Sequence, residues 1–543
     1  MSGEASVRRE RRLRDRVPVR LRHHWKPAAS LGVGLAAMVY FLGDARISPY
    51  VTSSSRVEAD AITDDVQGSV GLYDTSVSHS VQLTYQQTDF DKMMKEFKED
   101  GTKDYIEADL TIDGVYLNDV GIRLKGNSTL SSLRGNKGMP GGGRGRPGGA
   151  QGAPAGGGGG DRQGGMGGMG GMVQYDLSAR KPEELPWLVK VDEYVEGRAY
   201  QGEREISLRP GSNGQVPVNE ALSLALTKDS GQKAERYAFT EVKINNRPAA
   251  TRLMVEAPDT DYADDVADGN GVLYKAKASG GFEYHGNDPT EYESSFKQLN
   301  KKGSQDLEPV MKLIKWVNSA SDEEFARDLD KYVDVDSLAA YLAAQNLLLN
   351  FDDMAGPGKN YLLWYDLGTK KFSVLGWDYN LTFSGDATAG PEDSISMGGG
   401  VPGGGAAASG ASQGKPGALP SGAPEGMPEG MPSGMPEGMP GGAAGGGQGG
   451  GTAKGGQGGF MQHPLKTRFL DSDAFDGVYK KAYRELYQKF YGSGTASEKL
   501  KDVAAQARSA GAGSRELDTA VTKLQKTVTE RAKALAEDKE VTG

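Results

Sequence analysis

Residues 350–380 read NFDDMAGPGKNYLLWYDLGTKKFSVLGWDYN, and this stretch decides how the rest of the chain is interpreted. An apolar, helix-like run at 338–349 ends in the polar loop 350–360. Two strand-like segments follow, at 361–365 and 372–377, because both are rich in aromatic and aliphatic residues and a Gly-containing turn separates them. The pattern predicts a β-hairpin that turns near residue 369.

The predicted hairpin carries polar side chains at its base. Asn360 and Asp378 stand equally far from the turn, so we expect them to face each other, with Asp352 and Asp353 in the loop before the first strand. Oxygen ligands that converge on one point are what a hard divalent cation such as Mg²⁺ needs. Asn and Asp also suit turns for conformational reasons alone, so a plain turn is the competing interpretation.

The composition limits the class of protein. The chain has 543 residues with 79 Gly, five His, no Cys and a net charge of −10. The lack of Cys excludes disulfides and thiolate metal sites, and the acidic charge argues against a nucleic-acid-binding protein, which needs a basic surface. Two segments rich in Gly, Pro and Met, 138–172 and 394–462, hold too few large apolar residues to form a core and are predicted to be disordered insertions.

The N-terminus has a targeting pattern. Residues 1–27 contain nine Lys/Arg against three acidic residues, and an apolar run of about 17 residues follows, at the short limit for a membrane-spanning helix. Basic residues before the run and acidic residues after it predict a transmembrane signal anchor at 28–43. The expected localisation is the cell membrane, single-pass, with residues 1–27 cytoplasmic and the folded part extracytoplasmic. A cleaved signal peptide is the alternative.

The rest of the chain divides into a strand-rich part and a helical part, an α+β composition. Residues 44–79 are expected to be a linker, 80–393 a domain, and 463–543 a helical segment that packs on the earlier helices or forms a separate coil. In the strand-rich part, Asp113-Gly114 is a hairpin signal. The further elements predicted there and in the helical part are strands at 186–191, 237–246 and 252–256, and helices at 218–227, 291–299, 307–320, 322–333 and 336–349.

Six short stretches together carry a family resemblance. They are Gly121–Thr129 (GIRLKGNST), Pro186–Lys190 (PWLVK), Val272–Lys275 (VLYK), Asn350–Asp352 (NFD), Lys359–Asp366 (KNYLLWYD) and Gly376–Asn380 (GWDYN). Spread over about residues 80–390, the combination resembles the spore-coat CotH kinase family, atypical members of the protein-kinase-like fold. The resemblance implies a two-lobed fold with a strand-rich N-lobe and a helical C-lobe, and an ATP-dependent phosphotransferase that uses Mg²⁺ or Mn²⁺.

The resemblance also implies roles for individual residues. Asp378 and Asn360 would bind the metal ion, and Asp352 would orient the acceptor hydroxyl and accept its proton, with Asp353 as the rival for that role. Lys190 would contact the phosphates, with Glu220 as its ion-pair partner. The loop residues that would cover the nucleotide are Arg123, Lys125, Gly126, Asn127 and Ser128. Asp352 and Asn360 lie eight residues apart, farther than the corresponding pair of ordinary protein kinases, so the loop must differ in shape.

Three functions are compatible with these residues. The first is a membrane-tethered extracytoplasmic kinase that phosphorylates Ser or Thr of a surface or envelope protein. The second is a catalytically silent structural or binding protein of the envelope on the same fold, and the third is a nucleotidyl or other phosphoryl-type transferase. The set Asp352, Asn360 and Asp378 favours an enzyme. The expected partners are a surface protein and the membrane, and no nucleic acid.

Overall fold

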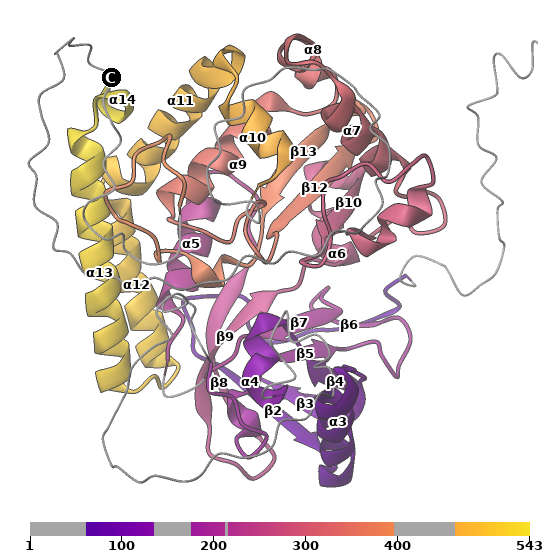
Figure 1. The fold of residues 1–543 in the computed structure, drawn as a ribbon. Coiled ribbons are helices and arrows are strands. Elements are labelled where there is room, and N and C mark those ends of the chain that lie inside the picture. The colour runs from indigo at the N-terminus through magenta and orange to yellow at the C-terminus, as the bar shows by residue number, and fades with distance from the viewer. Residues whose placement is uncertain (1–60, 135–174, 212–214, 396–461) are drawn as a thin grey trace, which may run out of the picture. The chain divides into compact units, whose positions relative to one another are not determined.

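The first part of the folded chain is a closed β-barrel (Figure 1). The computed structural model describes residues 61–134, 175–211, 215–395 and 462–543, all within one compact unit. Around the barrel the strands follow in the order β2, β3, β4, β5, β7, β9 and β8. Their bounds are β2 His79–Tyr85, β3 Ile106–Ile112, β4 Val115–Leu124, β5 Trp187–Lys190, β7 Glu205–Leu208, β8 Tyr237–Ile244 and β9 Ala250–Glu256.

The alternation of apolar and polar residues explains how the barrel forms. In β2 every second side chain from His79 to Tyr85 is buried and the others are exposed, as in a strand with one face on a core. The predicted turn at Asp113-Gly114 joins β3 to β4, and both residues have the positive φ that a tight hairpin requires. The strand pairs are antiparallel except β2–β8, which closes the barrel in parallel.

Helix α3 (Gln87–Asp100) covers part of the barrel wall, with Phe90 packed on Trp187 of β5. A short helix, α4 (Ser131–Arg134), packs against α3. Strand β1 (Asp64–Val66) pairs in parallel with β6 (Arg198–Tyr200), so part of the predicted linker 44–79 is ordered beside the barrel. The predicted helix 218–227 is confirmed as α5 (Val218–Asp229).

The second part combines a four-stranded sheet with helices. The sheet order is β11, β10, β12, β13, with bounds β10 Gly271–Ala276, β11 Phe296–Gln298, β12 Tyr361–Asp366 and β13 Phe372–Gly376. The β12–β13 pair is the predicted hairpin. The helix predicted at 291–299 is wrong: residues 289–294 form a 3₁₀ turn, and 296–298 pair with β10 as an edge strand. Pairing along the sheet edge outweighs local helix preference here.

The helices of this part continue to the C-terminus, with α12 and α13 standing beside α5 (Figure 1). They are α6 Thr260–Asp264, α7 Glu308–Ser319, α8 Asp322–Asp328, α9 Val335–Leu347, α10 Pro464–Leu470, α11 Asp473–Tyr487, α12 Thr495–Ser509, α13 Ser514–Glu537 and α14 Lys539–Thr542. Helix α11 packs on α9, and α12 packs on α5. The C-terminal segment therefore joins the core of the earlier helices rather than forming a separate coil.

The prediction of a single-pass protein of the cell membrane is corrected. Among the described residues, no helix is long and apolar enough to cross a membrane. The predicted anchor 28–43, with the basic segment 1–27, lies outside the described residues, and its apolar run was already at the short limit for a span. The predicted insertion 138–172 lies outside them as well, as does nearly all of 394–462. The α+β class is confirmed, whereas the kinase-like arrangement of two lobes stays a prediction.

Candidate functional site

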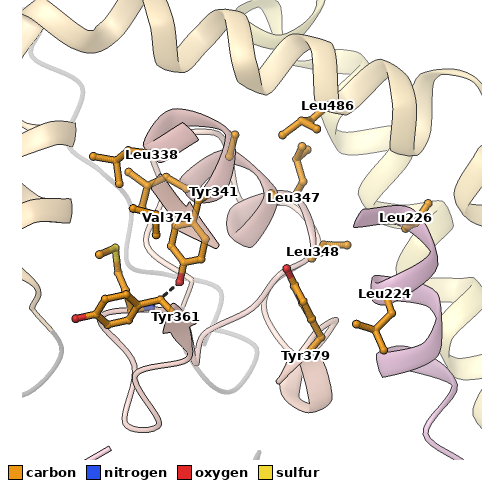
Figure 2. Close-up of a cluster of buried hydrophobic side chains, with 14 of the residues drawn as sticks. Leu224, Leu226, Leu338, Tyr341, Leu347, Leu348, Tyr361, Val374, Tyr379 and Leu486 are labelled. Atoms are coloured by element: carbon orange, nitrogen blue, oxygen red, sulfur yellow. Dashed lines mark hydrogen bonds between the residues drawn. The ribbon is translucent and has the colours of Figure 1, made fainter. Parts of the chain in front are cut away.

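The register of the β12–β13 hairpin sets the base of the site. Tyr361 pairs with Gly376, so the ladder would continue with Asn360 opposite Trp377, one position away from the expected Asp378. Asp378 follows directly with a left-handed backbone, φ 57°. The ring of Tyr379 lies between Leu348 at the end of α9 and Leu224 of α5 (Figure 2), and this packing holds the residue next to Asp378 in place.

The loop between α9 and β12 wraps around the Asp352 carboxylate. Oδ2 accepts a hydrogen bond from Nδ2 of Asn360 at 3.0 Å, and Oδ1 accepts one from the backbone N–H of Gly358. A β-carbon at position 358 would force the Asp352 carboxylate to shift and would press on the Asn360 amide, so glycine favours this arrangement. Because the Asn360 amide donates to Asp352, its own Oδ1 remains available to a cation.

Burial gives the Asp352 carboxylate an unusual titration. Only 6% of the residue is exposed, and this burial raises the pKa of Asp352 to about 6, while the Gly358 N–H opposes the shift. The charges of Asp378 and Asp353 raise it further. A pKa near neutrality suits a general base.

Asp353 has a different environment. Its Oδ2 forms an ion pair with Nζ of Lys466 on α10, and its Oδ1 accepts a hydrogen bond from the backbone N–H of Ala355 at 2.8 Å. The carboxylate is thus held by a lysine that follows the segment 394–462 in the chain. Asp352 forms no ion pair within the described residues, so of the two neighbours it is the one whose carboxylate is not neutralised by a cation.

A buried arginine links the barrel to Asp378. Arg209 directly follows β7, and its Nη2 lies 2.5 Å from Oε1 of Glu220 on α5 and 3.2 Å from Oδ1 of Asp378. The backbone N–H of Asp378 donates to Oε1 of Glu235 at 3.2 Å. Burial raises the pKa of both Glu220 and Glu235 to about 7, and Arg209 opposes the shift at each. Two carboxylates, Glu220 and Asp378, therefore pair with one guanidinium, and its charge also lowers the pKa of Glu235.

Two lysines border the same place. Burial, followed by the charge of Arg209, lowers the pKa of Lys125 to about 8, and Asp378 is among the groups that raise it. Burial, followed by the charge of Lys125, lowers the pKa of Lys275 to about 7. The ammonium group of Lys275 lies 3.3 Å from the centre of the Trp377 ring. Both ammonium groups have a lowered pKa and lie beside a cluster of acids. A polyanionic ligand would stabilise their protonated, charged forms.

Comparison with known proteins decides the family. Residues 177–526 match the family described as CotH kinase protein. The chain belongs to this CotH kinase family. Over 198 residues it is 25% identical to the inner spore coat protein H of Bacillus subtilis (strain 168), a match that covers 36% of this chain and 54% of that relative. The match thus spans about half the length of the relative, whose coat name also departs from the membrane localisation expected above.

The family match and the predicted site residues overlap only in part. The family match begins after the loop Arg123–Ser128 and continues through α10 to α12 into α13. It therefore extends beyond residues 80–390, which carried the resemblance. Lys466 therefore lies inside the CotH match although it follows the long 394–462 segment.

The structure brings some of the predicted residues together. Asp352, Asn360, Asp378, Glu220 and Lys125 all belong to the group described above. Lys190 does not: its Nζ pairs with Glu193 at 2.8 Å and Asp192 at 3.4 Å, and Glu220 pairs with Arg209 instead.

The remaining predicted residues surround the end of β4. The guanidinium of Arg123 lies 5.1 Å from the centre of the Tyr105 ring. Lys103 donates to the carbonyl of Gly126 and, at 2.9 Å, to Oδ1 of Asn127. A side chain from the segment before β3 therefore fixes the position of this loop. Gly126 has φ 113°, a conformation that glycine permits. Ser128 begins a 3₁₀ turn, and its side chain is not described.

Sequence reasoning missed Arg209, Glu235 and Lys466. Arg209 had a usable signal, since it ends a buried strand and precedes the loop into the helix that carries Glu220. Glu235 and Lys466 had none, because each meets its partner through contacts that span more than a hundred residues of chain.

The donor set suits a hard cation. Asp378 and Asn360 offer oxygen atoms, and Mg²⁺ is usually held by one or two carboxylates with substrate phosphates and water. Within the described residues, no group of three or more His, Cys, Asp or Glu is arranged to hold a metal by itself. The buried Oε2 of Glu235 accepts no hydrogen bond from the described part of the chain. The residues thus fit a metal ion that arrives with a phosphate ligand.

Proposed function

We propose that this chain is a CotH-like protein kinase that transfers the γ-phosphoryl group of ATP to a Ser or Thr hydroxyl. The observations that carry the proposal are the Asp352–Asn360 hydrogen bond in the loop before β12 and the ion pair of Asp378 with Arg209, which comes from a distant part of the chain. Family membership supports the same chemistry. For the acceptor we propose a surface or envelope protein, in keeping with the coat name of the relative.

The residues have separate tasks in this mechanism. Arg209, Lys125 and Lys275 provide positive charge for the phosphates, because phosphoryl transfer depends mainly on positioning and charge neutralisation. Asp378 and Asn360 would hold the metal ion, Mg²⁺ or Mn²⁺. When bound, that ion neutralises the charge that develops on the phosphate oxygens.

Asp352 orients the acceptor hydroxyl and takes its proton. The acceptor oxygen forms a bond to the γ-phosphorus, the bond from that phosphorus to the bridging oxygen breaks, and ADP leaves with the electron pair. Asp353 is fixed by Lys466, which supports Asp352 as the base. The hydrogen bonds from Gly358 and Asn360 hold the carboxylate in one orientation.

The test uses the full chain, γ-labelled ATP with Mg²⁺ or Mn²⁺, and casein as a generic Ser/Thr acceptor. We expect metal-dependent nucleotide binding, seen as a rise in melting temperature, together with label transfer to casein or to the chain itself. Asp378→Asn and Asp352→Asn should each reduce transfer by about 10²-fold or more.

Asp386→Asn is the matched control, because Asp386 follows Asp378 in the chain, is exposed, and bonds only within its own turn to Thr388. It should transfer label like the parent. If the parent neither binds nucleotide nor transfers label, the kinase proposal fails and the alternative, a catalytically silent structural protein, is left. The coat name of the relative is the observation that favours this alternative.

A further inference from the structure

A concave surface lies on the barrel. The groove has a volume of about 1040 Å³ and is lined by α3, by Tyr85 at the end of β2, by residues 179–182 and by the β8–β9 turn at 245–247. None of these residues belongs to the group around Asp352 and Asp378. The volume is at the upper end of the range of small-ligand pockets, so the groove has room for several side chains of a peptide.

The floor of this barrel groove is rigid and aromatic. The ring of Tyr85 stacks on Phe90 with centroids 5.3 Å apart, and both rings pack on Trp187. The wall is fixed by Asn245, whose side chain accepts a hydrogen bond from the Tyr85 N–H at 2.9 Å and donates to the Tyr85 carbonyl at 3.2 Å. A binding surface of this kind needs little ordering when a ligand arrives.

One polar atom of the floor has no partner. Tyr85 is only 7% exposed, and its hydroxyl forms no hydrogen bond with any residue that the structure describes. A buried hydroxyl without a partner costs free energy, and this one lies beneath the groove surface.

The rim is basic on an otherwise acidic chain. Four basic residues line the groove against the two acids Asp91 and Glu99, although the whole chain has a net charge of −10. Lys95 and Lys98 lie three residues apart on the exposed face of α3, with Arg180 on the opposite wall. The side chains of these three residues form no ion pair with any other described residue, whereas the fourth, Arg247, pairs with Glu183.

We propose that the barrel groove is a docking site for an extended acidic segment of a protein partner, with an apolar or aromatic side chain on the Tyr85–Phe90 floor and carboxylates on Lys95, Lys98 and Arg180. The positive rim favours a negatively charged ligand. The aromatic floor favours a peptide with an apolar side chain over a simple anion. This inference does not depend on the catalytic proposal, because the groove contains none of the residues assigned to phosphoryl transfer.

The experiment measures binding to the full chain by fluorescence anisotropy. The probe is the fluorescein-labelled peptide Glu-Glu-Leu-Tyr-Pro-Glu-Glu, and its reversed counterpart is Lys-Lys-Leu-Tyr-Pro-Lys-Lys. We expect the acidic peptide alone to bind, and the double variant Lys95→Glu/Lys98→Glu to weaken it about tenfold or more.

Lys92→Glu is the matched control, because Lys92 is exposed on α3 but does not line the groove. It should leave the affinity within about twofold. An equal loss in Lys92→Glu, or equal binding of the two peptides, would overturn the proposal. So would displacement of the probe by inorganic phosphate at matched ionic strength, which would indicate a simple anion site.

A last arm concerns the chain's own acidic repeat at 425–440, which contains three Glu and no Lys or Arg. Deletion of residues 396–461 should leave probe affinity unchanged. If the deletion tightens binding severalfold, the occupant is this segment, and docking of a separate partner is overturned.

Discussion

The two ends of the β5–β7 strand pair each carry a cation, and the two cations have opposite environments. The strands are antiparallel, with Trp187 opposite Leu208 at one end and Lys190 opposite Glu205 at the other. At the first end Arg209 is 10% exposed and binds Glu220 and Asp378, which come from other parts of the chain. At the second end Lys190 is 29% exposed and pairs with its near neighbours Asp192 and Glu193.

The difference shows which property of a charged residue identifies a site. Both residues look alike in sequence, as a cation at the end of a short apolar strand. Only the register of the strand pair and the path of the chain afterwards determine which of them reaches the acidic loop. A buried cation shared by several distant carboxylates is a better indicator of a functional group than a cation within an apolar run.

The largest expected effect follows from replacing both cations in the same way. Arg209→Met removes the cation that pairs with both Glu220 and Asp378, so we expect a loss of about 3–5 kcal/mol in the free energy of unfolding. Lys190→Met breaks a half-exposed local pair and should cost about 1 kcal/mol or less. Urea unfolding at pH 8 measures both.

The Arg209 effect should also depend on pH. The pKa of Glu220 and Glu235 is already about 7 with the arginine present, and Arg209 lowers both values. Without it the two carboxyl groups hold their protons to higher pH, so the destabilisation should be smaller at pH 5 than at pH 8. Equal losses for Arg209→Met and Lys190→Met would contradict the comparison, and nucleotide binding that depends on Lys190 but not on Arg209 would reverse it.

The sequence alone predicted those features that depend on residues close together in the chain. The strand at 237–246, the turn at Asp113-Gly114 and the hairpin after residue 360 were all predicted, because side-chain period and turn chemistry are local. The α+β class follows from the same patterns. The edge strand at 296–298 was mistaken for helix because its structure depends on pairing with β10.

The candidate site was predicted where its residues come from one stretch. Asp352 and Asn360 were selected from the loop itself, and the structure joins them by a hydrogen bond. Lys466 could not be found in this way, because 113 residues separate it from Asp353 and no local pattern marks it. The choice between Asp352 and Asp353 therefore depended on a contact that only the folded chain provides.

A second, smaller effect tests the acidic side of the comparison. Asp352 titrates with a pKa of about 6 instead of 3.8, so its protonated form is favoured in the folded state. The stability that this proton contributes is fully present below the unfolded pKa and is lost as pH rises through about 6. Asp352→Asn, which cannot ionise, should therefore be more stable than the parent at pH 8, by about 2 kcal/mol, and similar to it near pH 4.

Thermal or urea unfolding of both proteins at the two pH values provides the measurement. Asp366→Asn is a useful control because the pKa of Asp366 is lowered, chiefly by the backbone N–H of Thr369, so its effect on stability has the opposite sign at pH 8. If Asp352→Asn were destabilised at pH 8 and equal to the parent at pH 4, the carboxylate would be stabilised by the fold and its assignment as a base with raised pKa would be wrong.

The smallest expected effect concerns Lys275, which is only partly protonated at neutral pH, whereas Arg209 is fully charged. Burial lowers the pKa of Lys275 to about 7, so the free protein loses this charge as pH rises through 7, while a guanidinium remains charged. The affinity of the parent for ATP should fall between pH 7 and pH 9. In Lys275→Arg, where the cation can still stack on Trp377, the fall should be weaker by about two- to fivefold.

Lys297→Arg, an exposed neighbour on β11, should follow the parent. A parallel decline in all three proteins would mean that Lys275 does not meet the phosphates, and that the decline comes from another titrating group such as Lys125, whose pKa is about 8.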